Sequence, residues 1–309
     1  MRATFFVQRP RMLANDGLEI VPKSFKLLRG CVNFIGNEDG VVNPVWRVCG
    51  GLLAVMLTAG MAVLGQDGGG AVPTSAELAA ISERGRALAA YDLAVWHATD
   101  AVEMANPKTA EGRHYLARVE AGRWTVVFGA LNSEKSAFLI DYETVAQPGK
   151  PGQFEVKRDN PPREGGGFYL FAARALELAL ADFGEVVRPY NAAVLPEEEG
   201  RLYVYLYPAQ VKANVYPLGG DARYLVSADG GKILEKRQLH KTIIESGPVK
   251  GKKVVAGFHT HVLSDVPEDT DVLHVLQQEP PAPEMVGTAH FVYEIAADGA
   301  IRIKQEKKK

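Results

Sequence analysis

Two histidines and a group of carboxylates lie close together in the segment 257–271, GFHTHVLSDVPEDTD, where this chain has residues suited to chemistry. The apolar run 253–258 leading into it is typical of a buried strand, and residues two apart on a strand share a face. We therefore expect His259 and His261 to point the same way. Neutral imidazoles and one carboxylate form a common three-ligand set for zinc, with water in the fourth position. The segment is a candidate zinc site.

The carboxylates of this segment have a second interpretation. Apolar residues recur beyond it at helical spacing, at Val272, Leu273, Val275 and Leu276. This pattern predicts a helix that begins near residue 271, and acidic residues stabilise helix N-termini by accepting amide hydrogens. Asp265 or Asp269 could act as the cap, and Asp265 with Glu268 resembles a capping box. Capping requires no metal, so the acids alone do not decide between the two interpretations.

The order of these residues resembles a known signature. His259-Thr260-His261, followed one loop later by Asp271, is similar to the motif of the JAB/MPN (JAMM) metalloprotease-like domains. That family typically has His-Ser/Thr-His-Pro, a loop, and then Ser-x-x-Asp. The resemblance implies that His259, His261 and Asp271 are zinc ligands of a metal-dependent hydrolase. Val262 replaces the usual proline, and Glu268 stands where the serine is expected.

This resemblance covers roughly residues 238–305 and implies a catalytic glutamate on an earlier strand, for which Glu245 is the nearest candidate. The turn-rich connection 246–252 predicts an antiparallel hairpin between its flanking segments. In one register His240 faces His259, which makes His240 a candidate third imidazole ligand. Glu245 then lies roughly 16 Å from the histidines, too far for a general base. Glu268 is the second candidate catalytic residue.

Two further residues are candidate additional ligands. Asp265 lies in the loop after the histidines, and it also competes for the role of proton carrier. His274 follows Asp271 by three residues and shares its helix face, so it could ligate the metal, orient a ligand or simply complete an amphipathic face. A catalytic zinc site has three protein ligands and an open position, whereas a structural site has four.

Elsewhere the pattern predicts an α+β fold. A helix begins near residue 75 and continues to about 104, and strand-like runs that could form a meander follow it up to about 160. The Pro- and Gly-rich stretch 159–167 predicts a domain boundary. A second amphipathic helix covers 168–183, and a mixed or antiparallel sheet carrying the histidine site follows. The predicted parts are a linker at 66–74, a helix-plus-meander domain at 75–160 and an α+β domain at 166–305.

The N-terminal 65 residues are predicted to be a leader. The uncharged run 50–65, about 16 residues long, resembles the hydrophobic region of a bacterial secretory signal. It is shorter than the roughly 20 residues needed to cross a bilayer, which favours cleavage over a permanent anchor. The long stretch before it indicates either a true translation start further along, for example at Val42 or Val45, or a genuine extension with a retained helix. The expected location is the periplasm or the extracellular space.

Composition narrows the range of partners. Both cysteines, Cys31 and Cys49, lie in the leader, so the remainder can use neither disulfides nor cysteine ligands. That remainder has more acidic than basic residues, which argues against a nucleic-acid partner. A membrane contact is expected only through an uncleaved leader. Two hypotheses result: an exported zinc-dependent hydrolase acting on a peptide or small-molecule amide, or a non-catalytic envelope or extracellular domain in which the cluster is structural.

Overall fold

The computed structural model describes residues 71–106, 113–247 and 255–307. These residues form three α-helices and four sheets, a mixed α+β fold as the sequence predicts. The predicted leader, with its signal-like run, lies outside the described residues, as does most of the linker. Within the described ranges, no helix is long and apolar enough to cross a membrane.

The long helix α1 (Ser75–Ala105) begins at Thr74, whose side chain accepts a hydrogen bond from the amide of Glu77. An antiparallel meander packs against the second half of α1. It consists of β1 (His114–Glu120), β2 (Arg123–Leu131), β3 (Phe138–Ala146) and β4 (Phe154–Gly165). Tyr91 and Val95 of α1 share a core with Val126 and Phe128 of this sheet.

The helix α2 (Phe168–Phe183) has the predicted limits and packs between the meander and a second antiparallel sheet. That sheet has the strand order β5-β6-β8-β9, formed by β5 (Tyr190–Pro196), β6 (Leu202–Pro208), β8 (Ala222–Val226) and β9 (Ile233–Gln238). A short 3₁₀ turn, η1 (Glu198–Gly200), connects the first two of these strands. Leu116 and Val127 of the meander share one core with Leu176 of α2 and Val204 of β6, so residues on both sides of the predicted boundary pack together.

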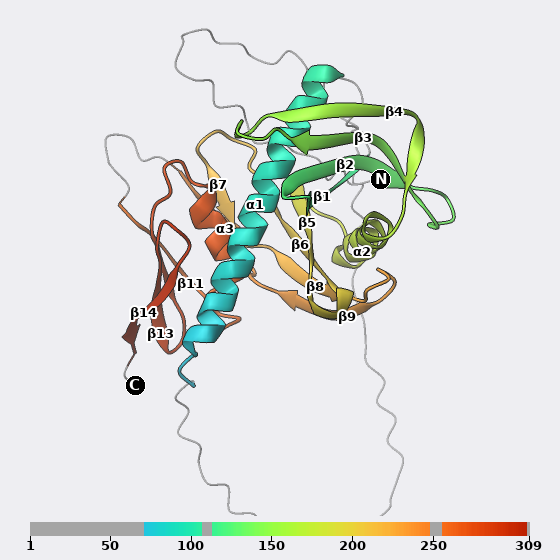
Figure 1. The fold of residues 1–309 in the computed structure, drawn as a ribbon. Coiled ribbons are helices and arrows are strands. Elements are labelled where there is room, and N and C mark those ends of the chain that lie inside the picture. The colour runs from blue at the N-terminus through green and yellow to red at the C-terminus, as the bar shows by residue number, and fades with distance from the viewer. Residues whose placement is uncertain (1–70, 107–112, 248–254, 308–309) are drawn as a thin grey trace, which may run out of the picture. The chain divides into compact units, whose positions relative to one another are not determined.

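The C-terminal part contains the crossover that places the histidines. Strand β11 (Gly257–Thr260) pairs in parallel with β12 (Glu284–Gly287), and β13 (Phe291–Ile295) and β14 (Ile301–Glu306) continue the sheet in antiparallel fashion. Helix α3 (Asp269–Gln277) connects β11 to β12, as a parallel pair requires a crossover. It packs against the first half of α1 (Figure 1). Leu78 and Ile81 of α1 share a core with Val272 of α3.

The predicted hairpin between residues 238–245 and 253–261 does not form. Strand β10 (Ile244–Ser246) pairs with β7 (Tyr216–Leu218), and β11 pairs with β12. The stretch 159–167 is also not a simple linker, because β4 extends through it to Gly165. Its prolines are tolerated there because β4 is the edge strand of the meander, where one side of the backbone has no partner.

Candidate metal centre

Four side chains from three separate segments converge on one point. His240 lies just after the end of β9, His259 lies on β11, and His261 is one residue beyond β11. Asp271 lies in the first turn of α3 and is fully buried. One donor atom from each of these residues lies within 4.8 Å of all the others. The cluster could therefore hold a metal ion.

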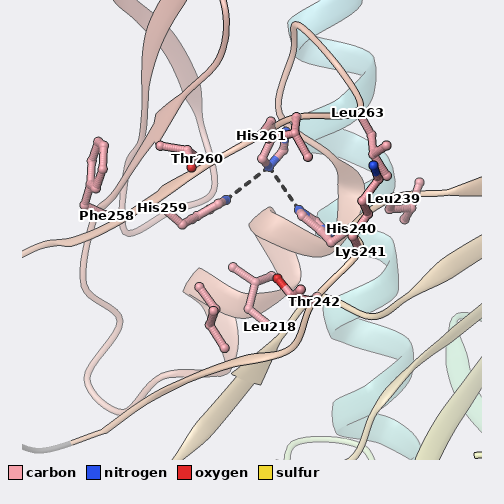
Figure 2. A pocket seen from close by; sticks show the side chains of 13 residues that line it. Leu218, Leu239, His240, Lys241, Thr242, Phe258, His259, Thr260, His261 and Leu263 are labelled. Carbon is pink, nitrogen blue, oxygen red and sulfur yellow. Dashed lines mark hydrogen bonds between the residues drawn. The ribbon is translucent and has the colours of Figure 1, made fainter.

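The Nε2 atoms of the histidines face one another (Figure 2). His261 Nε2 lies 2.9 Å from His240 Nε2 and 3.1 Å from His259 Nε2. Asp271 completes the group, with Oδ1 3.1 Å from Nε2 of both His240 and His259 and Oδ2 3.1 Å from that of His261. Four potential ligand atoms thus surround one small volume.

Each imidazole is held from its other side by an oxygen acceptor. Nδ1 of His240 is 2.8 Å from Asp221 Oδ1, and Nδ1 of His259 is 2.9 Å from Glu284 Oε1. Nδ1 of His261 lies 3.0 Å from the carbonyl oxygen of Val266. Carboxylate and carbonyl oxygens accept hydrogen bonds, so these contacts place the proton on Nδ1. They are the outer contacts that orient metal-ligating histidines.

When the rings are neutral, this tautomer leaves a lone pair on each Nε2, and three such atoms then face a carboxylate with no hydrogen between them. Among the described residues, Asp271 Oδ1 is buried without any hydrogen-bond donor, although it lies 3.1 Å from two ring nitrogens. Acceptors so close together repel unless a cation lies between them. The lone pairs that converge in the cluster therefore fit a bound metal ion.

The distances between the ligand atoms of the cluster also fit a bound zinc ion. Tetrahedral zinc with bonds of about 2.0–2.1 Å separates its ligand atoms by about 3.3 Å. The nitrogen–nitrogen and nitrogen–oxygen separations of 2.9–3.1 Å need to open by only a few tenths of an ångström. Imidazole ligands suit zinc, copper, iron and nickel. Geometry alone leaves the identity of the metal open.

The surrounding carboxylates make the cluster strongly attractive to positive charge. Burial lowers the pKa of His240, but Asp271 and Asp221 outweigh it and raise that pKa to about 11. Burial likewise opposes protonation of His259, whereas Asp271 and Glu284 raise its pKa to about 9. Burial raises the pKa of Asp271, but His240 and His261 hold it well below the usual value. Protons and a metal ion would compete for the same position.

A cavity of about 440 Å³ opens directly onto the three histidines. Apart from the histidines, it is lined by backbone and by apolar, threonine and lysine side chains. Its remaining lining residues are Leu218, Gly219, Leu239, Lys241, Thr242, Ile244, Phe258, Thr260, Val262 and Leu263. Figure 2 shows His240 from one segment, and His259 and His261 from another, converging within this lining. Solvent-sized molecules can therefore reach the nitrogen side of the cluster.

The two candidate catalytic glutamates lie outside this lining. Glu245 is on β10, where its exposed carboxylate pairs with Arg188 at 3.0 Å. Glu268 is the N-cap residue of α3, and its buried carboxylate binds Arg237 at 2.6 Å. Burial raises the pKa of Glu268 to about 7 despite the arginine.

Of the three additional candidate ligands, one joins the cluster and two do not. His240 joins the cluster, although the predicted hairpin does not form. The carboxylate of Asp265 instead binds Nδ1 of His290 at 2.6 Å. Buried His274 places its Nε2 3.1 Å from the hydroxyl of Ser246. Both lie outside the four-residue group.

The predicted caps of α3 are also different. Asp271 accepts the amide of Glu268 at 2.7 Å, so the residue facing the histidines also fixes the first turn of its own helix. Asp269 pairs instead with Arg84 and Arg223 and accepts a hydrogen bond from Tyr205. These contacts connect the start of α3 to α1 and to the second sheet, and so fix the position of Asp271.

Sequence reasoning missed the residues that orient the histidines. Asp221 precedes β8 and Glu284 begins β12, and nothing in their local sequence marks them. No family model, curated protein or solved structure matches this chain.

Proposed function

We propose that this protein is a metal-dependent hydrolase that cleaves peptide or amide bonds at the His240/His259/His261/Asp271 centre. The proposal depends above all on the three Nε2 atoms, which converge beside a carboxylate and face an open cavity. The resemblance to JAB/MPN domains agrees with this class of reaction, and zinc is the metal it favours.

An edge strand beside the cavity supports a peptide-like substrate. The amide of Gly257 donates a hydrogen bond to the carbonyl oxygen of Pro283, and the amide of His261 donates to that of Gly287. The backbone groups of these alternate residues therefore face β12. The backbone groups of Phe258 and Thr260 therefore point to the other side, where β11 is the edge of its sheet. Such an edge can pair with an extended peptide and place its carbonyl groups near the histidines.

The chain itself would supply binding and orientation. The histidines and Asp271 would hold the ion, while Asp221 and Glu284 keep the imidazole rings in place. Bound there, zinc would act as a Lewis acid that polarises a carbonyl and acidifies water. No carboxylate belongs to the described cavity lining, so the hydrolytic role depends on the metal centre and the strand edge rather than on a glutamate base.

The number of protein donors favours a second candidate function. A structural zinc site closes its shell with four protein ligands, and four donors are present here. In that case the ion would join β11, α3 and the end of β9 without catalysis. The two functions differ in whether a position of the ion remains open to the cavity.

The first experiment is elemental analysis of the full chain purified without a histidine tag. We expect near-stoichiometric metal in the wild type, its loss in a His259→Ala/His261→Ala variant, and its retention in a His290→Ala control. A metal-free wild type that takes up no zinc on titration would refute the metal centre.

Cobalt substitution then distinguishes the catalytic from the structural function. A cobalt spectrum that changes with added thiol or hydroxamate indicates an open position on the ion. An unchanged four-coordinate spectrum indicates a structural site.

A further inference from the structure

The cavity over the candidate metal centre has an unusual composition. Four of its apolar residues are exposed, among them Phe258 with 66% and Val262 with 76% of the residue's surface accessible. Leu263 and Ile244 are the other two. Exposed apolar residues grouped around a cavity mark a place where an apolar group binds.

The same lining has a net positive character. Lys241 is its one non-histidine charged residue among the described residues, and no aspartate or glutamate accompanies it. Lys241 follows His240, whose amide and ring both bind Asp221, so the backbone leading into the lysine is held in place. Its ammonium group forms no ion pair within the described part of the chain. It is therefore available to a ligand.

Charge complementarity indicates which ligand this is. The three carboxylates around the centre, Asp271, Asp221 and Glu284, lie outside the described cavity lining, whereas Lys241 belongs to it. Such a cavity favours an anion, while its exposed apolar residues favour an apolar side chain. Its volume of about 440 Å³ is at the lower end of the range for small-ligand sites. An apolar amino acid with a free carboxylate combines all three properties.

We propose that the substrate is a peptide or N-acyl amino acid with an apolar C-terminal residue, whose free carboxylate binds Lys241. Phe258 and Val262 contact the apolar side chain of that residue. Water is added across the amide bond, so that the acyl carbon gains the hydroxyl group and the amino acid leaves with the proton on its nitrogen. This inference rests on the proposed hydrolytic function and assigns its specificity.

The test uses a pair of probes, N-(mercaptoacetyl)-leucine and its C-terminal amide, whose thiol binds the metal. The zinc-loaded full chain should bind the carboxylate probe about tenfold more tightly than the amide, as expected for one charge-assisted contact. Lys241→Met should remove this preference by weakening binding of the carboxylate probe alone, and Lys241→Arg should retain it. Lys304→Met, which removes a lysine that pairs with Glu294, should behave as wild type.

Each outcome identifies which inference fails. Equal binding of both probes to metal-loaded wild type, or a preference that survives in Lys241→Met, overturns the carboxylate role and leaves the metal centre standing. If neither probe binds and the protein contains no metal, the proposed function and the specificity fail together. Increasing salt should reduce the preference, because the lysine is exposed and its charge is screened.

Discussion

Replacing Asp269 by asparagine should greatly destabilise the protein, although Asp269 is not one of the four residues of the candidate metal cluster. The Asp269 side chain is 1% exposed, and its carboxylate is 3.0 Å from Arg84 and 2.6 Å from Arg223. Burial disfavours the charge of Arg223, but Asp269 outweighs it and raises the pKa of Arg223 above the ordinary value. Asparagine keeps the shape and removes the charge. Arg223, only 9% exposed, would then lack its counter-ion.

The expected loss follows from the burial of each partner. Removing one member of a buried ion pair costs about 3–5 kcal/mol, whereas an exposed pair contributes about 0–1 kcal/mol. Arg84 is 31% exposed and can be hydrated, so Arg223 accounts for most of the loss. We expect Asp269→Asn to lower the free energy of unfolding by about 3 kcal/mol.

Urea denaturation monitored by circular dichroism, in the presence of EDTA, measures this loss without any contribution from metal. The matched control is Glu245→Gln, which neutralises the exposed carboxylate paired with Arg188 and should cost less than about 1 kcal/mol. If the two variants lose equal stability, then Asp269 does not anchor α3 and the reasoning is refuted. The variant should also bind zinc more weakly, because α3 carries Asp271.

Two further predictions concern packing and pH. Gly85→Ala should lower the free energy of unfolding by about 1–3 kcal/mol, because the added Cβ would lie 2.4 Å from an atom of α3. Alanine otherwise favours a helix over glycine by about 1 kcal/mol, and an Ala79→Gly variant at an exposed position of α1 measures this helix propensity alone. A Gly85→Ala variant more stable than wild type would contradict the close packing. Hydrogen bonding from His114 lowers the pKa of Glu177 to about 2. A carboxylate whose pKa is lowered in the folded state adds stability at pH values above its unfolded pKa of 4.5. Glu177→Gln should therefore be less stable than wild type by about 1 kcal/mol at pH 7. Urea titrations should show this difference vanish as the pH falls from 4.5 to 2. A difference that persists at pH 2 would mean that the charge is not its cause.

Local sequence signals were sufficient where an element depends on its own side chains. The helix 168–183 was predicted with its observed limits, because its apolar residues recur on one face and glycines flank it at 167 and 184. Local residues also explain the turns between β8 and β9 and between β13 and β14, which contain Gly230 and Gly299. Both glycines have positive φ, a conformation for which glycine is strongly favoured.

Strand pairing was not determined by these signals. The turn-forming residues between β10 and β11 indicated that the chain reverses there, but they could not identify each strand's partner. β10 binds β7 and β11 binds β12, and both partners are distant in sequence from the turn. An apolar strand pattern fits many partners equally well, so its pairing is decided by the tertiary fold.

His240 shows how a correct placement can follow from an incorrect route. The hairpin register brought it to His259 as a cross-strand neighbour, whereas the structure brings it there as a loop residue held by Asp221 at its amide and its ring. A loop histidine on a mobile chain would make a poor ligand, because fixing its backbone and side chain costs conformational entropy. The two hydrogen bonds that His240 donates to Asp221 hold its backbone and its ring in place without an ion. Asp221 and Glu284 carry no sequence signature of a metal site, yet they determine which nitrogen of the His240 and His259 rings faces the cluster. The capacity of this site to hold a cation therefore depends on carboxylates that do not contact the ion as much as on the four residues that would.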